Sequence, residues 1–152
     1  MYASKIIMES FPNIHLLGTL TIAYTLVYRK KALYPIYTYV FLNGLLSGFG
    51  VWWIPYLYVW TILWGLTMLL PRNIPDKFKP IVYMLLCAFH GFSFGILYAP
   101  SQALLFGLNF ERMIAWIISG LPFDIIHGIS NFFIGALIVP IVNIIQKMDR
   151  NK

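Results

Sequence analysis

Apolar runs alternate with short polar breaks along most of the chain. A helix needs about twenty mostly apolar residues to cross a bilayer. Five runs reach this length once their flanks are included: His15–Tyr28, Ala32–Phe49, Trp53–Leu70, Pro80–Ala99 and Leu121–Ile145. The pattern predicts an all-α integral membrane protein with a single domain that covers residues 1–152.

Two stretches fit the pattern less well. Met1–Phe11 ends at Pro12 and is too short to cross a bilayer, so we interpret it as the outer end of a first helix that is truncated or unusually short. Polar residues interrupt Pro100–Gly120, which we expect to be irregular apart from a short helix at Met113–Ser119. The expected fold is therefore a bundle of about six transmembrane helices.

The positions of the basic residues predict the orientation of this bundle. Nine of the eleven Lys and Arg residues lie in three segments, Arg29–Lys31, Arg72–Lys79 and Lys147–Lys152. Basic segments beside membrane helices stay in the cytoplasm. The three segments fall at alternate connections, so both termini are expected to be cytoplasmic and Pro12 to lie outside. We interpret the net charge of +6 as topology, with no nucleic acid as a partner.

Composition supports a membrane location and argues against catalysis. The chain is 60% hydrophobic and only 11% charged, whereas soluble domains carry about 25% charged residues. The single cysteine, Cys87, excludes an internal disulfide. The sequence has no G-x-S-x-G, H-E-x-x-H or P-loop motif, so we expect neither an enzyme nor a nucleotide-binding protein. Transport driven by ATP would need a partner.

The last predicted crossing carries three polar side chains, Asp124, His127 and Asn131. Their spacing of i, i+3 and i+7 places them on one helix face. Ionisable groups inside a membrane are costly and usually face another helix or a water-filled cavity. We interpret this face as the lining of a ligand site. The alternative is a polar seam that only hydrogen-bonds neighbouring helices.

The other candidate binding residues also fall in the outer half of the predicted bundle. Tyr56 and Trp60 are one helical turn apart and could stack on a planar ligand or simply pack. The inner half is mainly Leu, Ile, Val and Met, which predicts a pocket that opens outward and disfavours an ion or proton carrier. The full set of candidate residues is Asn13, His15, Asn43, Tyr56, Trp60, His90, Asp124, His127 and Asn131.

Two further patterns have structural interpretations. Imidazole suits several transition metals, but the three histidines come from three different segments and form no H-x-x-x-H pair. We therefore expect no metal site and no cofactor, with a divalent-metal uptake subunit as an alternative. The G-x-x-x-G patterns Gly44–Gly48 and Gly91–Gly95 are interpreted as close helix packing.

The chain resembles the substrate-binding S component of energy-coupling factor transporters. The resemblance covers most of the sequence and uses the turn Pro12–Gly18 (PNIHLLG), the stretch Leu45–Trp64 and the last helix, Asp124-x-x-His127-x-x-x-Asn131-x-x-x-Gly135 with Pro140.

The resemblance implies a multi-pass protein of the prokaryotic cytoplasmic membrane that binds a vitamin or similar micronutrient from outside. Its partners would be a membrane T component and two cytoplasmic ATPase subunits, within the lipid bilayer. In the family, the loop after the first helix and the last three helices form the pocket. Two features depart from the family: Ile7 interrupts an A-x-x-x-A pattern after Ala3, and the chain starts Met1-Tyr2 where metal-binding members have Met-His. A structural or assembly membrane protein is the alternative from another class.

Overall fold

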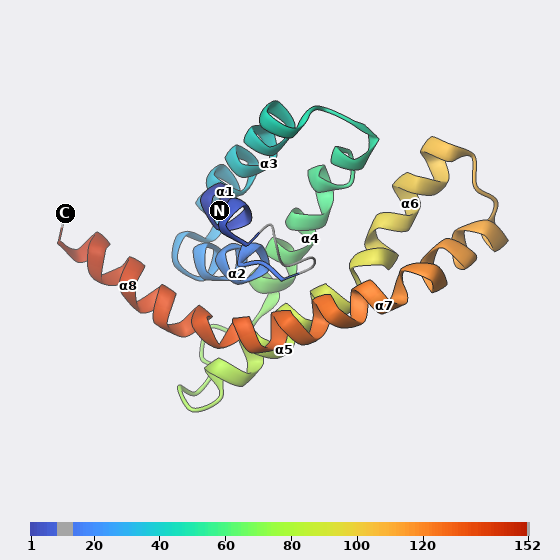
Figure 1. The fold of residues 1–152 in the computed structure, drawn as a ribbon. Coiled ribbons are helices and arrows are strands. Elements are labelled where there is room, and N and C mark those ends of the chain that lie inside the picture. Colours follow the sequence, from blue (N-terminus) through green and yellow to red (C-terminus); the bar gives the residue numbers. More distant parts are fainter. Residues whose placement is uncertain (9–13, 152) are drawn as a thin grey trace.

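A computed structural model of the protein describes residues 1–8 and 14–151. All regular secondary structure in these residues is helical (Figure 1). The chain forms α1 (Tyr2–Ile7), α2 (Leu17–Tyr28), η1 (Arg29–Ala32), α3 (Leu33–Ser47), η2 (Val51–Trp53), α4 (Tyr56–Leu69), α5 (Lys79–Phe92), α6 (Phe94–Phe106), α7 (Phe110–Ile134), η3 (Gly135–Leu137) and α8 (Ile138–Arg150). The predicted all-α class is confirmed.

Two helical rods dominate the architecture. The first joins α5 to α6 over Lys79–Phe106, and the second joins α7, η3 and α8 over Phe110–Arg150 (Figure 1). Within the described residues, these two have the length and apolar composition needed to cross a membrane. The second rod has 41 residues, which at the usual helical rise is about 60 Å, twice the hydrocarbon thickness of a bilayer. Both rods are consistent with a membrane location.

The remaining predicted crossings form shorter helices. The runs His15–Tyr28, Ala32–Phe49 and Trp53–Leu70 contain α2, α3 and α4, with 12, 15 and 14 residues. Each is shorter than the span of about twenty residues that a perpendicular crossing needs. The predicted first helix is represented by α1, of six residues.

The prediction that Pro100–Gly120 is irregular is wrong. α6 continues through Pro100, and α7 begins at Phe110 and continues through Pro122. A proline removes the helical hydrogen bond to the carbonyl four residues earlier, which is that of Ile96 for Pro100 and Ile118 for Pro122. The neighbouring serine hydroxyls bond other carbonyls, so they do not replace the lost bonds. Ser101 donates to the Tyr98 carbonyl, and Ser119 donates to the Trp116 carbonyl, each over 2.8 Å.

The actual break is a tight turn between α6 and α7. Gly107 ends α6 with a positive φ of 61°, a conformation that favours glycine. Asn109 then caps α7, because its side-chain oxygen accepts a hydrogen bond of 2.9 Å from the Arg112 backbone N–H. The two helices return alongside each other as a hairpin at the end of the molecule opposite α8 (Figure 1).

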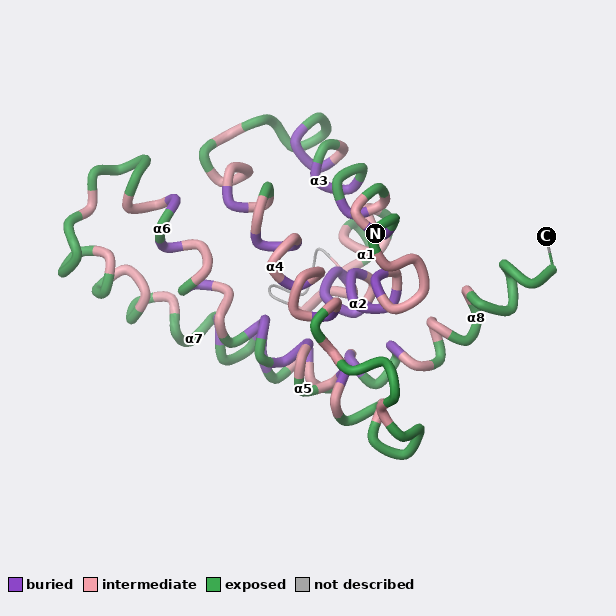
Figure 2. Tube along the Cα trace, turned by 180° about the vertical axis from the view of Figure 1, so that it is seen from behind, coloured by how far each residue is buried: buried purple, intermediate pink, exposed green. Residues whose placement is uncertain are grey.

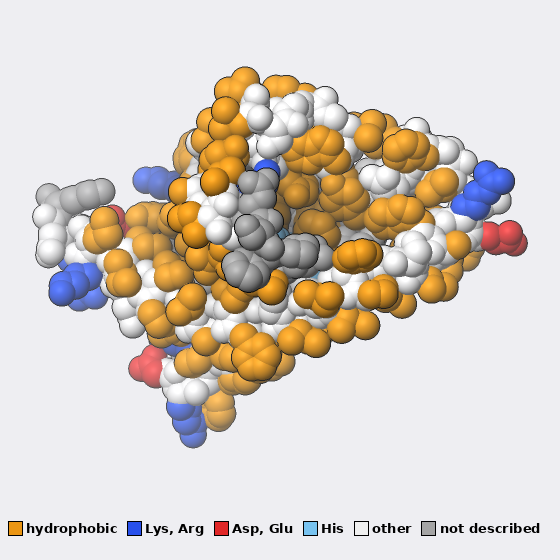
Figure 3. Space-filling model, viewed as in Figure 1, with side chains coloured by type: hydrophobic (Ala, Val, Ile, Leu, Met, Phe, Trp, Pro, Cys, Tyr) orange, Lys and Arg blue, Asp and Glu red, His pale blue; other side chains and the backbone are white. Residues whose placement is uncertain are grey.

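The core forms around α2, which packs against α4, α5 and α8. Figure 2 shows the buried positions concentrated on α2 and on the faces of neighbouring helices that meet it. The largest fully buried apolar side chains include Leu17, Ile22, Ile36, Trp60 and Leu63. Outside this core, large apolar side chains cover much of the surface (Figure 3), among them Leu104, Phe110 and Phe133, each more than two-thirds exposed. Such a surface is suited to lipid or to protein partners.

The two glycine patterns have different roles. Gly91 and Gly95 face α7: a Cβ on Gly91 would lie 2.8 Å from the His127 carbonyl oxygen, and one on Gly95 would collide with the Asp124 carboxylate. Close helix packing is confirmed for this pair. It is wrong for Gly48, which ends α3 with a φ of 88° and where a Cβ would meet no atom within 4 Å. At Gly44 a Cβ would collide with the Phe49 and Trp53 side chains, so this glycine allows the segment after α3 to approach closely.

Candidate functional site

Five rings from four parts of the chain meet in what we call the histidine cluster: His15, Trp60, His90, Phe94 and His127. His15 precedes α2, Trp60 lies in α4, His90 and Phe94 lie on either side of the α5–α6 junction, and His127 lies in α7. Six centroid separations between them lie between 4.9 and 6.2 Å. The three histidines and Trp60, which the sequence assigned to one candidate site, therefore lie together in the structure.

Polar atoms of this cluster are buried without hydrogen-bond partners. Four of them are His15 Nδ1, Trp60 Nε1, His90 Nδ1 and His127 Nε2. More than nine-tenths of buried polar groups in proteins have a partner, and an unsatisfied one costs about 1–3 kcal/mol. The imidazole and indole groups therefore retain unused hydrogen-bonding capacity in a closed environment.

The hydrogen bond of His90 determines which of its ring nitrogens carries the proton. Its Nε2 lies 3.2 Å from the Val59 carbonyl oxygen, which can only accept, so Nε2 carries the proton and donates. In the neutral ring, Nδ1 is then an acceptor, and it is the atom without a partner. His90 can accept a hydrogen bond from a ligand in this state, while the Trp60 indole can only donate one.

Asn131 lies one helical turn beyond His127 on α7. Its Nδ2 donates to the Cys87 carbonyl on α5 over 3.3 Å, and its Oδ1 is buried without a partner. Tyr56 extends the cluster on the other side, with its ring 5.9 Å from Trp60 and 6.4 Å from Tyr98. Both residues therefore lie beside the histidine cluster, as the helical spacing predicted.

Asp124 serves helix packing in this structure. Both of its carboxylate oxygens lie 3.1 Å from the backbone N–H of Gly95. Gly95 is in the first turn of α6, where N–H groups lack helical partners and an anion is favourable. Asp124 thus caps α6 from the neighbouring rod, a use that the sequence did not predict.

Two other predicted residues do not join the cluster. Asn43 is buried on α3, where its Oδ1 accepts a 2.6 Å hydrogen bond from the Lys5 ammonium. Its Nδ2 is buried without a partner, and none of the ring contacts of the histidine cluster includes Asn43, so its role in the site stays a prediction. Asn13 lies outside the described residues.

Sequence reasoning missed Phe94 and underrated Tyr98. Phe94 contacts the rings of Trp60, His90 and His127, and it stacks on Tyr98, with an interplanar angle of 28°. Tyr98 stacks in turn on Trp116, with an angle of 11°. The i, i+4, i+8 spacing of His90, Phe94 and Tyr98 could have predicted this row, because such positions share a helix face.

No group of three His, Cys, Asp or Glu side chains in residues 1–8 and 14–151 is arranged to hold a metal ion. His15 and His127 touch edge to face, while His90 contacts Trp60 and Phe94, so the three rings do not form a metal-binding group. What the cluster offers is a set of flat apolar faces with a few donors and acceptors, the usual chemistry of a pocket for a small organic molecule.

Comparison of the chain with protein-family models, curated proteins and solved structures yields no match.

Proposed function

We propose that the protein is the substrate-capture subunit of an energy-coupling factor type importer, which binds a vitamin-like organic micronutrient from the outside. The observation that supports this most is the unused hydrogen-bonding capacity of the histidine cluster. A planar, partly polar ligand would give these buried groups partners while its ring packed against Trp60 and Phe94. Burial makes each such hydrogen bond specific as well as favourable.

Individual residues have separate roles in this proposal. The Trp60 indole donates a hydrogen bond to the ligand, His90 accepts one through Nδ1, and the Asn131 oxygen accepts another. His15 and His127 complete the polar rim. Asp124 holds α6 against α7 and acts on the ligand only through that positioning.

The membrane arrangement is part of the proposal: about six transmembrane helices in the cell membrane, with both termini in the cytoplasm. The two long apolar rods and the exposed apolar surface support it. Lys and Arg side chains lie over α8 and below α5 in Figure 3, and another charged group marks the α6–α7 turn at the opposite end. A T component and two ATPase subunits would supply energy, since the sequence carries no nucleotide-binding motif.

Intrinsic tryptophan fluorescence of the purified protein tests capture directly. Trp60 lies in the cluster, so a ligand should change its emission. We expect saturable quenching by one compound in a panel of vitamins and nucleobases, and loss of this response in Asn131→Leu. Asn73→Leu is the matched control, because Asn73 is exposed in the connection between α4 and α5. Quenching that survives Asn131→Leu with unchanged affinity would contradict the assignment.

A structural or assembly protein is the second candidate, supported by the Asp124–Gly95 and Asn131–Cys87 contacts between α7 and the α5–α6 rod. It predicts that no compound in the panel changes the fluorescence or the melting temperature, and that Asn131→Leu only lowers stability. A response to nickel or cobalt alone would favour a divalent-metal uptake subunit.

A further inference from the structure

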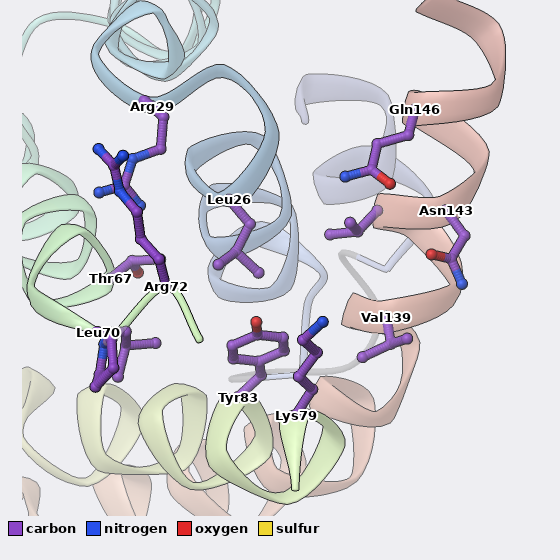
Figure 4. A pocket seen from close by; sticks show the side chains of 12 residues that line it. Leu26, Arg29, Thr67, Leu70, Arg72, Lys79, Tyr83, Val139, Asn143 and Gln146 are labelled. Carbon is purple, nitrogen blue, oxygen red and sulfur yellow. The ribbon is translucent and has the colours of Figure 1, made fainter. Parts of the chain in front are cut away.

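A second polar region shares no residue with the histidine cluster. It lies between η1, the first turns of α5 and the Val139–Gln146 part of α8. It is a cavity of about 450 Å³, within the usual range for small-ligand pockets. Figure 4 shows side chains from α2, α4, α5 and α8 around it. Its polar lining includes Arg29, Arg72, Lys79, Tyr83, Asn143 and Gln146.

The lining carries three positive charges and no carboxylate among its described residues. Like charges around one space repel each other, more strongly as solvent is excluded. Lys79 is partly neutralised by Asp76, which accepts a hydrogen bond of 2.6 Å from its ammonium. Among the described residues, Arg72 has no hydrogen-bond or ion-pair partner. The cavity therefore has an excess of positive charge.

Arg29 is held in place by its surroundings. Its backbone has a positive φ of 53°, uncommon outside glycine, and its carbonyl accepts a 3.1 Å hydrogen bond from the Trp64 indole. Its guanidinium donates to the Met68 carbonyl at the end of α4 over 3.2 Å. Its Nε is buried without a partner. Arg29 thus combines an unusual backbone conformation, two fixed hydrogen bonds and a buried N–H without a partner. Unusual backbone conformations are common at functional sites.

The other groups suit the same ligand. In Figure 4 the Tyr83 hydroxyl and the Lys79 ammonium both point from α5 into the space between α2 and α8, and the Gln146 amide points inward from α8. Guanidinium, ammonium and hydroxyl groups donate hydrogen bonds, and arginine matches the oxygens of phosphate in pairs. The arrangement favours an anion with several acceptor oxygens.

We propose that this cavity binds a phosphate-bearing anion, held mainly by Arg29 and Arg72. The inference does not rest on the proposed function, since the cavity and the histidine cluster share no residue. Two sources supply this chemistry: the headgroup of an anionic phospholipid and free inorganic phosphate. Basic pockets between membrane helices at the cytoplasmic side are known to take lipid headgroups.

The test uses the full chain in detergent with two probes, inorganic phosphate and short-chain phosphatidylglycerol. Binding is followed by the melting temperature and by native mass spectrometry. We expect saturable binding of at least one probe, weakened by about tenfold or more in Arg72→Gln, the effect of losing one charge-assisted hydrogen bond. Lys30→Gln is the matched control, because Lys30 is exposed beside Arg29 but does not line the cavity.

The two sources give different results. A lipid site binds phosphatidylglycerol more tightly than inorganic phosphate, and phosphate competes with it only weakly. A free-phosphate site shows the reverse order. Arg29→Gln should also weaken binding, but it removes a contact to α4, so Arg72→Gln decides the outcome. Binding of neither probe, or an equal loss in Lys30→Gln and Arg72→Gln, would overturn the proposal.

Discussion

The rings of His15 and His127 lie 4.9 Å apart between centroids and meet at 71°. One histidine precedes α2 and the other lies in the middle of α7. Each has a buried ring nitrogen without a partner, His15 Nδ1 and His127 Nε2. The edge-to-face geometry is that of an aromatic pair, so the contact leaves the hydrogen-bonding capacity of both rings unused.

Replacing His127 by Phe should separate binding from stability. Phenylalanine keeps a flat ring against His15 and Phe94 but removes the unpartnered nitrogen, so the free energy of unfolding should fall by less than about 1 kcal/mol or rise. Ligand binding should be lost. Thermal unfolding and fluorescence titration measure the two effects, and a large drop in the melting temperature would instead support a purely structural seam.

Glycine substitutions in α5 should reveal the tight contact with α7. Gly91→Ala places a Cβ 2.8 Å from the His127 carbonyl and 2.9 Å from the Asn131 amide. Relieving such overpacking costs about 1–3 kcal/mol. Gly65→Ala is the control, since a Cβ there meets nothing within 4 Å in the middle of α4, and it should stabilise by about 0.5–1 kcal/mol. Equal effects of both changes in thermal unfolding would be inconsistent with the described packing.

The charge of Asp124 should matter less than its acceptor oxygens. Asp124→Asn keeps an oxygen that can accept from the Gly95 N–H, whereas Asp124→Ala leaves that N–H buried and unpaired. We expect Asp124→Ala to lower the free energy of unfolding by about 1–2 kcal/mol, the usual cost of losing a helix cap, and Asp124→Asn to lower it by less. Chemical denaturation measures both. A more damaging Asp124→Asn would show that the charge itself is needed.

The Asp76 carboxylate should weaken anion binding in the cavity lined by Arg29, Arg72 and Lys79. The hydrogen bond and positive charge of Lys79 lower the pKa of Asp76, so this carboxylate stays ionised at neutral pH and offsets the lysine charge. Asp76→Asn removes the negative charge and should raise the affinity for inorganic phosphate or phosphatidylglycerol several-fold, because Lys79 becomes a full cation beside the cavity. The same titration in Asp149→Asn, a change outside the lining, should show a smaller effect.

Helical spacing was enough to predict the centre of the histidine cluster. His127 and Asn131 share a face of α7, and Tyr56 and Trp60 share a face of α4, because positions four apart lie above each other in a helix. We expected these polar residues to be buried because the surrounding sequence is apolar. The prediction that these faces share one region used the membrane orientation, which placed them all in the outer half of the bundle.

The partners of individual polar groups could not be predicted in the same way. Asp124 finds the Gly95 N–H only because α6 begins at Phe94, and no sequence signal placed a helix start there. Asn43 accepts from Lys5 because α1 packs on α3, a tertiary contact. The helices through Pro100 and Pro122 were missed because proline normally ends a helix.

The Asp124–Gly95 contact also makes the two rods mechanically dependent on each other. The α5–α6 rod consists of two helices that meet at Ser93, and the N–H of Gly95, in the first turn beyond Ser93, is held by the opposite rod. A slide of α7 by a single residue moves the carboxylate by about 1.5 Å, enough to break that bond. Two adjacent residues therefore fix the start of α6 to α7: the Phe94 ring contacts His127, and the Gly95 N–H contacts Asp124. The histidine cluster and the hairpin of α6 and α7 thus meet at the same point of the fold.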